Sequence, residues 1–378
     1  MRIAMNARLL RSPTLRGINR YSVNLLAELA KCDLEIQLFT DAPIHEKHLA
    51  VFGKPNVRVV LSERMNYPRW LHGWVPAQCG ERGIDIFHSP MNFGLPLRCP
   101  CFRVLTLHDA IEKAYYGGGR NLSSWKSPGA VHNLFDHWAS RTTADAILTV
   151  SEHARQDIVK HYGISRETIS VTYEAAEERF FRPIDPPTRA AVRAKYQLPS
   201  RYVLYLGGWE KRKNVPFLLR GFAEAKLPAT GLVLGGGKDD EKPAVRDMAR
   251  SLGIEAAVHL LGWVDDEDLP ALYAESLGFV YPSEYEGFGL QICEAMAAGC
   301  PVLAANATSL PEILGNGGEL FTLEGTSQLA DLLRRLVGEP GFGDDLVRRA
   351  CERARSFNWA QTARQTVAVY QRLVNAGQ

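Results

Sequence analysis

EGFGLQICEAMAAGCPV, residues 286–302, is the stretch of this 378-residue chain that most constrains its fold. Two glutamates, Glu286 and Glu294, stand eight positions apart in it. After Glu286, the loop that leads into the expected helix of Glu294 is made of Gly287, Phe288, Gly289 and Leu290. Glycines let a backbone approach a ligand closely, and the free N–H groups at a helix N-terminus bind phosphate oxygens. Because carboxylates accept hydrogen bonds from hydroxyls, the segment predicts a site for a ligand that carries both phosphate and hydroxyl groups.

On both sides of this segment, short apolar runs alternate with longer amphipathic patterns. This alternation is typical of doubly wound α/β folds with parallel sheets. The expected strands are 3–7, 34–39, 57–61, 85–88, 102–107, 146–150, 169–173, 202–206, 231–234, 258–261, 278–281, 302–304 and 319–321. The expected helices are 18–30, 131–141, 152–161, 215–225, 242–252, 267–274, 291–298, 328–337 and 358–375.

One break in the alternation divides the chain. Residues 180–187, FFRPIDPP, continue neither a strand nor a helix and are interpreted as a linker. The length of the chain also favours two domains. We predict a first Rossmann-like domain over 1–182, a second over 188–356, and a final helix over 357–378. Ligands of doubly wound sheets bind at the carboxyl ends of the strands, so we expect these ends to face a cleft between the domains.

A second candidate site is YLGGWEKRKN, residues 205–214. An expected strand ends at Gly207 and Gly208, and Arg212 and Lys213 precede the next helix. Two cations beside a helix N-terminus can bind a diphosphate and neutralise its charge as it leaves. Arg212 and Lys213 are therefore candidate catalytic residues, and an ordinary basic loop is the alternative.

Two histidines follow expected strands in the first half. His88 follows IDIF, and His108 follows VLTL and precedes Asp109. Side chains at these strand ends are expected to face the cleft. A histidine there is also often a hydrogen-bonded core residue, and that alternative stays open for His88. His108 is the preferred candidate.

The segment 286–302 resembles the E-x7-E motif of glycosyltransferase family 4, whose members have the GT-B fold. The first residues, MRIAMNARLL, and residues 16–21, RGINRY, resemble the start of bacterial mannosyltransferases that extend O-antigen and other surface polysaccharides. Asn19 stands where that pattern has glycine. Residues 357–359, FNW, resemble the F-x-W that precedes a last helix crossing back to the first domain. The resemblance covers nearly the full chain.

The resemblance implies a retaining hexosyltransferase that uses a nucleotide diphosphate sugar. It places Arg212 and Lys213 at the diphosphate, because Gly208 stands where some members carry the arginine. It also places His108 near the transferring sugar and the acceptor hydroxyl, and makes Glu286 catalytic. The implied donor-binding residues are Gly17, Gly207, Gly208, Val264, Asp266, Gly287, Phe288, Gly289, Leu290 and Glu294. An acidic side chain in residues 262–266, GWVDD, can accept from guanine, which favours GDP-mannose as donor.

Neither a metal nor a cofactor is predicted. No Asp-x-Asp stands at an expected strand end, so the Arg212–Lys213 pair would take the place of a metal ion. No carboxylate is obviously placed as a covalent nucleophile, which favours a front-face displacement. The seven cysteines include no C-x2-C pair, so neither a zinc site nor a disulfide framework is expected.

Composition and charge limit the class of protein. No run of ~18 apolar residues and no signal peptide are present, which predicts a cytoplasmic protein. The net charge of +2 argues against a nucleic-acid binder. Residues 1–70 hold 11 Lys or Arg against 6 Asp or Glu. This excess fits a phosphate-bearing or lipid-linked saccharide acceptor, or peripheral contact with the inner face of a membrane, and an ordinary solvated surface is an equally open alternative.

Three alternatives stay open at this point. A nonhydrolysing sugar-nucleotide epimerase has two such domains, but it should lack the 286–294 motif and needs no acceptor. A periplasmic sugar-binding protein should carry a signal peptide and needs no paired cations, because free sugars carry no diphosphate. A UDP-sugar-dependent transferase of the same fold is the third. The preferred hypothesis is a retaining, metal-independent mannosyltransferase of polysaccharide or lipopolysaccharide synthesis.

Overall fold

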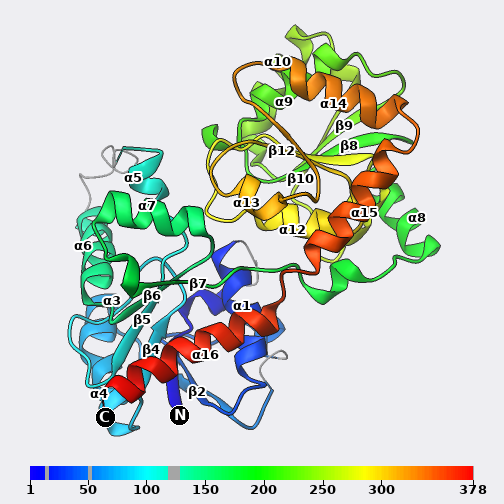
Figure 1. The fold of residues 1–378 in the computed structure, drawn as a ribbon. Coiled ribbons are helices and arrows are strands. Elements are labelled where there is room, and N and C mark those ends of the chain that lie inside the picture. The colour runs from blue at the N-terminus through cyan, green and yellow to red at the C-terminus, as the bar shows by residue number, and fades with distance from the viewer. Residues whose placement is uncertain (13–16, 50–52, 118–127, 378) are drawn as a thin grey trace. The chain divides into compact units, whose positions relative to one another are not determined.

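The computed structural model describes residues 1–12, 17–49, 53–117 and 128–377. The chain forms two compact units, each built around one sheet (Figure 1). Unit 1 comprises Met1–Glu174 and Asn358–Gln378, and unit 2 comprises Ala175–Phe357. The first crossing between the units thus precedes residues 180–187, where the sequence pattern places the linker.

Unit 1 contains a seven-stranded parallel sheet with strand order β3-β2-β1-β4-β5-β6-β7. The order reverses between β1 and β4, which makes their carboxyl ends the expected ligand-binding edge. Apart from the partly exposed edge strand β3, the strands are apolar and largely buried because helices cover both faces of the sheet. They are β1 (Arg2–Asn6), β2 (Glu35–Thr40), β3 (Val57–Leu61), β4 (Ile86–Ser89), β5 (Phe102–Thr106), β6 (Ala146–Thr149) and β7 (Ile169–Val171).

The helices of unit 1 include two that lie side by side although they come from opposite ends of the chain. These are α1 (Ile18–Leu29) and α16 (Trp359–Ala376), coloured blue and red in Figure 1. Thr362 of α16 donates a hydrogen bond of 2.5 Å to the Tyr173 carbonyl. The remaining helical segments are η1 (Arg8–Arg11), α2 (Glu46–Leu49), α3 (Tyr67–Arg69), η3 (Trp70–Trp74), α4 (Val75–Glu81), α5 (Ile111–Ala114), α6 (Pro128–Thr143), α7 (Glu152–Tyr162) and η5 (Arg166–Thr168).

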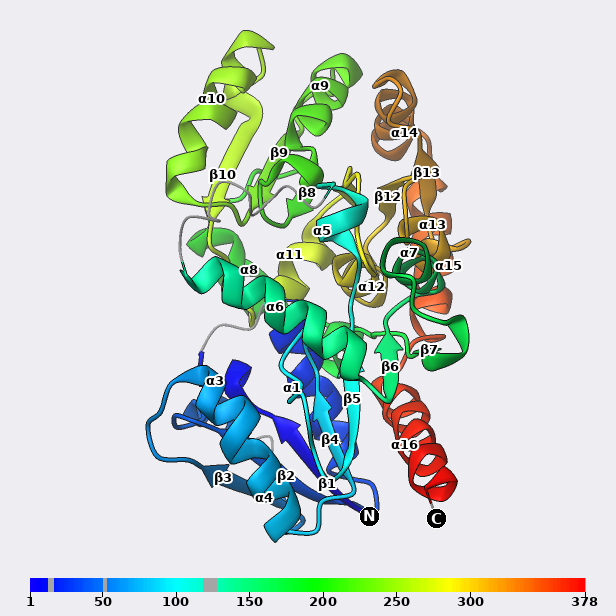
Figure 2. The same ribbon diagram turned by 90° about the vertical axis from the view of Figure 1, so that its left-hand side faces the viewer.

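Unit 2 contains a six-stranded parallel sheet with strand order β10-β9-β8-β11-β12-β13. Its order reverses between β8 and β11. Figure 2 shows α9 and α14 beside this sheet, and the two helices pack against each other. The strands are β8 (Tyr202–Leu206), β9 (Gly231–Gly235), β10 (Val258–Gly262), β11 (Gly278–Tyr281), β12 (Val302–Ala305) and β13 (Glu319–Phe321).

The helical segments of unit 2 that lie between β8 and β13 connect these strands. All the helical segments of this unit are η6 (Glu178–Phe181), α8 (Pro186–Lys195), η7 (Lys211–Lys213), α9 (Val215–Ala225), η8 (Asp239–Glu241), α10 (Lys242–Ser251), η9 (Glu255–Ala257), α11 (Leu269–Glu275), α12 (Leu290–Ala297), α13 (Leu310–Leu314), α14 (Ser327–Gly338) and α15 (Phe342–Ala354). Of these, α9, α10, α11, α12 and α14 correspond to predicted helices, whereas α8, α13 and α15 were not predicted.

The expectation that residues 180–187 form no regular element is wrong at both ends of that segment. A short helical turn continues to Phe181, and α8 begins at Pro186. The Asp185 side chain accepts a hydrogen bond of 2.7 Å from the Thr188 amide and so caps α8. Proline is tolerated in a first helical turn because its missing N–H has no partner there.

The predicted doubly wound parallel architecture is confirmed in both units. The predicted final helix is also confirmed, and it is part of unit 1. Among the helices of the described residues, none is long and apolar enough to cross a bilayer.

Candidate active site

The switch point of unit 2 brings together the two motifs singled out in the sequence. Strands β8 and β11 are neighbours, with Gly278 and Phe279 of β11 paired to Val203 and Leu204 of β8. The loop 207–214 follows β8, and the loop 282–289 follows β11. Parallel strands place both loops at the same edge of the sheet, where doubly wound folds bind ligands.

Main-chain and side-chain hydrogen bonds tie these two loops together. The Arg212 carbonyl accepts from the Glu284 amide at 2.7 Å and from the Ser283 hydroxyl at 3.2 Å. Asn214 has a positive φ of 51° and ends the turn η7 before α9 begins. This local geometry fixes the backbone from which Arg212 and Lys213 project.

Glu286 is the centre of the resulting cluster. Its Oε1 atom accepts hydrogen bonds from Lys213 Nζ at 2.7 Å and from Arg212 Nη1 at 2.9 Å. The same atom accepts from Ser283 Oγ at 2.6 Å and from Tyr281 Oη at 3.1 Å. Within the part of the chain that the structure describes, no hydrogen bond to Oε2 is present. One carboxylate oxygen therefore holds the cluster together.

Burial and charge set the protonation of this cluster. Burial alone would raise the pKa of the Glu286 carboxyl, but the charges of Lys213 and Arg212 outweigh it and lower that pKa. Burial lowers the pKa of Lys213, and attraction to Glu286 opposes the shift. Burial and the Glu286 charge raise the pKa of Tyr281. The cluster thus contains one carboxylate, two cations and a neutral phenol, with Glu210 as an exposed acidic neighbour.

Residues from the start of α13 hold the loop that follows Glu286. The Ser309 hydroxyl is 3.0 Å from the carbonyl oxygens of both Glu286 and Phe288, and Thr308 Oγ1 accepts from the Glu286 amide at 3.0 Å. Gly289 has a φ of +94° and a Cβ there would lie 2.8 Å from Leu310. Glycine is therefore required for this turn into α12, and Gly287 and Leu290 complete the predicted loop.

Glu294 lies in the interior of unit 2, on α12. Its side chain is 2% exposed, and the Tyr273 hydroxyl of α11 donates to its Oε2 atom at 3.3 Å. A carboxylate this deeply buried requires hydrogen-bond donors. Tyr273 fixes one of its oxygens.

The glycines after β8 allow close approach of two backbone segments. The Gly207 amide donates to the Gly235 carbonyl at 3.0 Å, and a Cβ on Gly236 would lie 2.1 Å from the Gly207 carbonyl oxygen. Tyr205 donates from its hydroxyl to the Gly208 carbonyl. Backbone packing therefore explains glycine at 236, and at 207 a Cβ would lie 2.9 Å from the Tyr205 hydroxyl oxygen.

The segment proposed to bind the base follows β10. Val264 is buried, and a Cβ on Gly235 would lie 3.1 Å from its Cγ2 atom. The carbonyl of Asp266 accepts a hydrogen bond from Arg179. The neighbouring Asp265 pairs with Lys195 at 2.7 Å. Val264 and Asp266 thus follow the edge strand β10, two positions along the sheet from β8.

In unit 1, His108 follows β5 and is 5% exposed. Its Nε2 atom lies 3.1 Å from the Pro90 carbonyl oxygen, which can accept a hydrogen bond from that nitrogen. Its Nδ1 atom lies 3.4 Å from a Glu174 carboxylate oxygen. The Tyr21 ring meets the imidazole edge-on, with 4.6 Å between centroids. These contacts fix the orientation of the ring at the carboxyl end of the sheet.

His88 is a core residue, so the expectation that it faces a cleft is wrong. Its side chain is fully buried, with Nδ1 2.6 Å from the Tyr370 hydroxyl and Nε2 2.8 Å from Thr106 Oγ1. Burial, and secondly the proximity of His108, lowers the pKa of His88 to about 3. The histidine stays neutral and joins β4 to β5 and α16.

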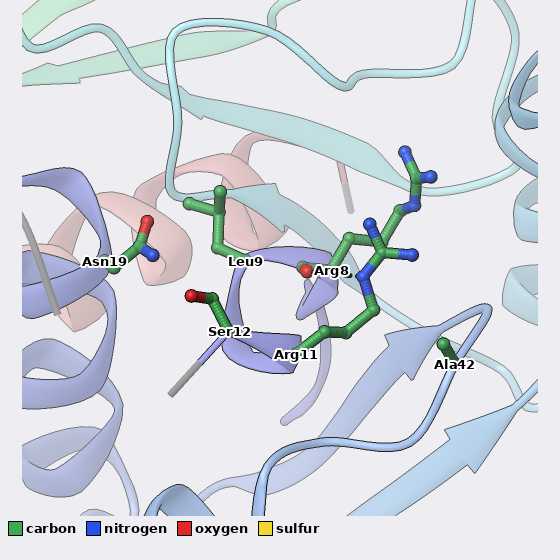
Figure 3. Close-up of a pocket in the computed structure, with 6 residues that line it drawn as sticks. All are labelled: Arg8, Leu9, Arg11, Ser12, Asn19 and Ala42. Atoms are coloured by element: carbon green, nitrogen blue, oxygen red, sulfur yellow. Dashed lines mark hydrogen bonds between the residues drawn. The ribbon is translucent and has the colours of Figure 1, made fainter. Parts of the chain in front are cut away.

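Gly17 directly precedes α1 and has a φ of +39°, and Arg16 lies outside the described residues. Near this helix, a pocket of about 520 Å³ opens at the carboxyl ends of β1 and β2. Figure 3 shows the side chains of Arg8 and Arg11 extending next to each other from η1. Both guanidinium groups contact Asp41, at 2.9 and 2.7 Å. The pocket is lined by Arg8, Leu9, Arg11, Ser12, Asn19 and Ala42.

Sequence reasoning missed four residues of the unit 2 cluster. Tyr281 ends an expected strand and Ser283 follows it. The expectation that side chains at strand ends face a ligand site, which selected His108, therefore applied to them as well. Thr308 and Ser309 carry no comparable signal, because their contacts to Glu286 depend on the packing of α13 against the loop.

Comparisons with known proteins identify the family of the chain. The family described as Glycosyl transferases group 1 matches residues 189–356, and Glycosyltransferase Family 4 matches residues 15–177. The O-antigen chain mannosyltransferase B of Escherichia coli is 30% identical over 95% of this chain and 97% of its own length. The chain belongs to glycosyltransferase family 4.

Solved structures of similar fold align with nearly the whole chain. Sucrose-phosphate synthase from Thermosynechococcus elongatus aligns with a TM-score of 0.76 and 22% identity, covering 99% of both chains. The Anabaena HepE complex with UDP-glucose aligns with a TM-score of 0.77 and 19% identity, covering 98% of this chain and 99% of that one. The predicted GT-B fold of this glycosyltransferase is thereby confirmed, and family membership decides against the epimerase and the periplasmic binding protein.

Proposed function

We propose that this glycosyltransferase transfers a hexose, with retention, from a nucleotide diphosphate sugar to a saccharide or lipid-linked saccharide acceptor. The observation that carries the proposal is the Arg212–Lys213–Glu286 cluster at the switch point of unit 2. Two cations share one carboxylate there, so the three groups together keep one positive charge. A diphosphate complements that charge, and charge-assisted hydrogen bonds to phosphate are among the strongest that proteins make.

The chemical step proposed is a front-face displacement. The bond between the acceptor oxygen and the anomeric carbon forms as the bond from that carbon to the phosphate oxygen breaks. The departing phosphate takes the proton of the acceptor hydroxyl, and Arg212 and Lys213 stabilise the charge that develops on it. Glu286 contributes its Oε2 atom as an acceptor for a sugar hydroxyl. Glu294 and the loop 287–290 are assigned to the ribose and the phosphates.

His108 is assigned to the transferring sugar and the acceptor hydroxyl. In this structure both ring nitrogens contact protein groups, Pro90 and Glu174. A substrate hydroxyl would therefore share or replace one of these contacts. The fixed ring at the carboxyl end of β5 supports the assignment, because that edge of a doubly wound sheet binds ligands.

GDP-mannose is the proposed donor, and a UDP-sugar is the alternative. The likeness to an O-antigen chain mannosyltransferase supports mannose and a role in surface polysaccharide synthesis. We expect GDP at ~100 times its Kd to raise the melting temperature by roughly 5–10 °C, because that excess adds ~2.7 kcal/mol. UDP at the same concentration should give a smaller shift, and GMP, which lacks the second phosphate, serves as control. A larger shift with UDP would reverse the donor assignment.

Transfer is proposed to need no divalent ion, because Arg212 and Lys213 supply the positive charge at the diphosphate. Activity should stay within about twofold of its initial value when EDTA is added in excess, since no part of the proposed phosphate site is lost. The measurement is sugar transfer before and after chelation. Loss of transfer with EDTA, followed by recovery with Mn²⁺ or Mg²⁺, contradicts the proposal.

The acceptor is proposed to carry phosphate, and the pocket beside η1 supports this idea. Among the described residues, the carboxylate paired with Arg8 and Arg11 is that of Asp41, which leaves one positive charge there. Arg11→Ala should raise the KM for such an acceptor roughly fivefold, about 1 kcal/mol for a partly exposed charge, and leave the donor KM unchanged. Arg58→Ala on β3 is the matched control. If Arg11→Ala and Arg58→Ala change the acceptor KM equally, or if neither changes it, then Arg11 belongs to an ordinary solvated surface and the proposal is wrong. Peripheral membrane contact stays a prediction from the charge count.

A further inference from the structure

Three cysteines lie close together at the end of the unit 1 sheet where the strands begin, which is the end opposite to His108. Cys79 lies on α4, and Cys99 and Cys101 flank Pro100 just before β5 begins. Their three sulfur atoms lie within 4.8 Å of one another, and Cys99 Sγ is 3.3 Å from Cys101 Sγ. No other residues in the described ranges form such a group of three or more histidine, cysteine or acidic side chains.

The packing of α4 against the turn at Pro100 produces this cluster. A bend over Pro100 and Cys101 directs both flanking thiols to the same side. Gly80, next to Cys79, faces that turn, and a Cβ on it would be in ordinary van der Waals contact with Pro100 Cγ, at 3.7 Å. Cys79 is 1% exposed, and the other two thiols are partly buried against the same hydrophobic core. The thiols are therefore held together by well-packed structure.

We propose that Cys79, Cys99 and Cys101 bind one soft metal ion, Cu(I) or Zn(II), through three thiolates. A metal–sulfur distance of ~2.3 Å requires sulfur atoms ~3.8–4.0 Å apart around a shared ion. The Cys99–Cys101 separation of 3.3 Å and the upper limit of 4.8 Å for all three sulfur atoms bracket this spacing, so small side-chain rotations complete the site. Thiolates select soft ions. Each cysteine that binds the metal as thiolate releases its proton to solvent.

The position of the cluster separates it from the transferase chemistry. Cys101 precedes β5 and His108 follows that strand, so the length of β5 lies between them. An ion at this end would join α4 to the start of β5 and would stabilise unit 1 without touching the donor or acceptor groups. We expect bound metal to raise the melting temperature and to leave kcat unchanged.

The test uses the full chain, reduced and freed of metal with a chelator, and titrated with Cd²⁺ as a spectroscopic probe of thiolates. One Cd²⁺ per chain should bind, with the ultraviolet charge-transfer absorption of three thiolates. Cys99→Ser and Cys101→Ser should each weaken Cd²⁺ binding by more than about tenfold. Even the loss of a residue that only hydrogen-bonds to a metal ligand lowers metal affinity ~10–100-fold. Cys32→Ser and Cys351→Ser are matched controls and should bind like the unaltered chain.

Zn²⁺ and Cu(I) are then tested for competition with Cd²⁺ and for an increase in melting temperature. The ion that displaces Cd²⁺ with a gain in stability is the one assigned to the site. The proposal is overturned if the fully reduced chain shows no thiolate absorption with Cd²⁺. It is also overturned if Cys99→Ser and Cys101→Ser bind as tightly as the controls. A Cys99–Cys101 disulfide that forms readily in a chain without metal affinity would assign the cluster to redox chemistry instead.

Discussion

Lys213→Ala is expected to lower kcat/KM by ~10²–10³ while unit 2 stays folded, the usual result of removing one group that stabilises developing charge. Lys213 Nζ is one of two cations on Glu286 and projects from the loop after β8. Removing it leaves Glu286 with hydrogen bonds from Arg212, Tyr281 and Ser283. The carboxylate is then still satisfied, so the loss should fall on phosphate stabilisation more than on folding.

Lys211→Ala is the matched control for this experiment, because Lys211 lies in the same turn and is exposed. Its activity should equal that of the unaltered enzyme. Transfer rates, circular dichroism and melting temperature are measured for both variants. A Lys213→Ala enzyme within about threefold of full activity, roughly 0.7 kcal/mol of barrier, would remove Lys213 from the catalytic site.

His108→Ala and His88→Ala are expected to fail in opposite ways. The two histidines lie at the ends of adjacent strands, and both are buried. His108→Ala should lower kcat by ~10²-fold with little change in nucleotide affinity, because the proposed contact acts on the transition state. His88→Ala should leave the Tyr370 hydroxyl without its His88 partner, at a cost of roughly 1–3 kcal/mol, while Thr106 keeps its hydrogen bond with Tyr21.

Calorimetric binding of the nucleotide, turnover per folded molecule and melting temperature distinguish these two outcomes. His88→Ala should melt early and retain near-normal turnover in its folded fraction. If His108→Ala shows that same pattern, then its contacts to Pro90 and Glu174 are structural and the acceptor side of the site must be sought elsewhere in unit 1.

Much of the fold was predictable because parallel strands that are buried on both faces form continuous apolar runs. The strands at 202–206, 278–281 and 319–321 and the helix at 215–225 have the predicted bounds. The helical stretch from Tyr67 to Glu81 was missed, because Pro68, Gly73 and Pro76 interrupt its pattern. Its buried residues Trp70, Leu71 and Val75 fill the core beside β2 and β4.

The candidate site was predictable only as far as it is local in sequence. Glu286, Arg212 and Lys213 stand in motifs whose chemistry can be read from neighbouring residues. Their sharing of a single oxygen atom depends on β8 pairing with β11, a contact between segments about seventy residues apart. The cysteine cluster depends likewise on α4 packing against Pro100. Spacing rules for cysteine do not detect a group whose members are separated by a helix and a strand.

The assignment of α16 to unit 1 has a consequence for synthesis of the chain. Unit 2 is continuous in sequence, whereas unit 1 is completed by residues that follow unit 2 in the chain. Until α16 emerges, α1 lacks the helix beside it, and His88 lacks the Tyr370 hydroxyl. Although domains generally fold in order from the N-terminus during translation, here the unit that is started first is finished last. Nascent unit 1 must therefore keep an apolar face exposed while the whole of unit 2 is made.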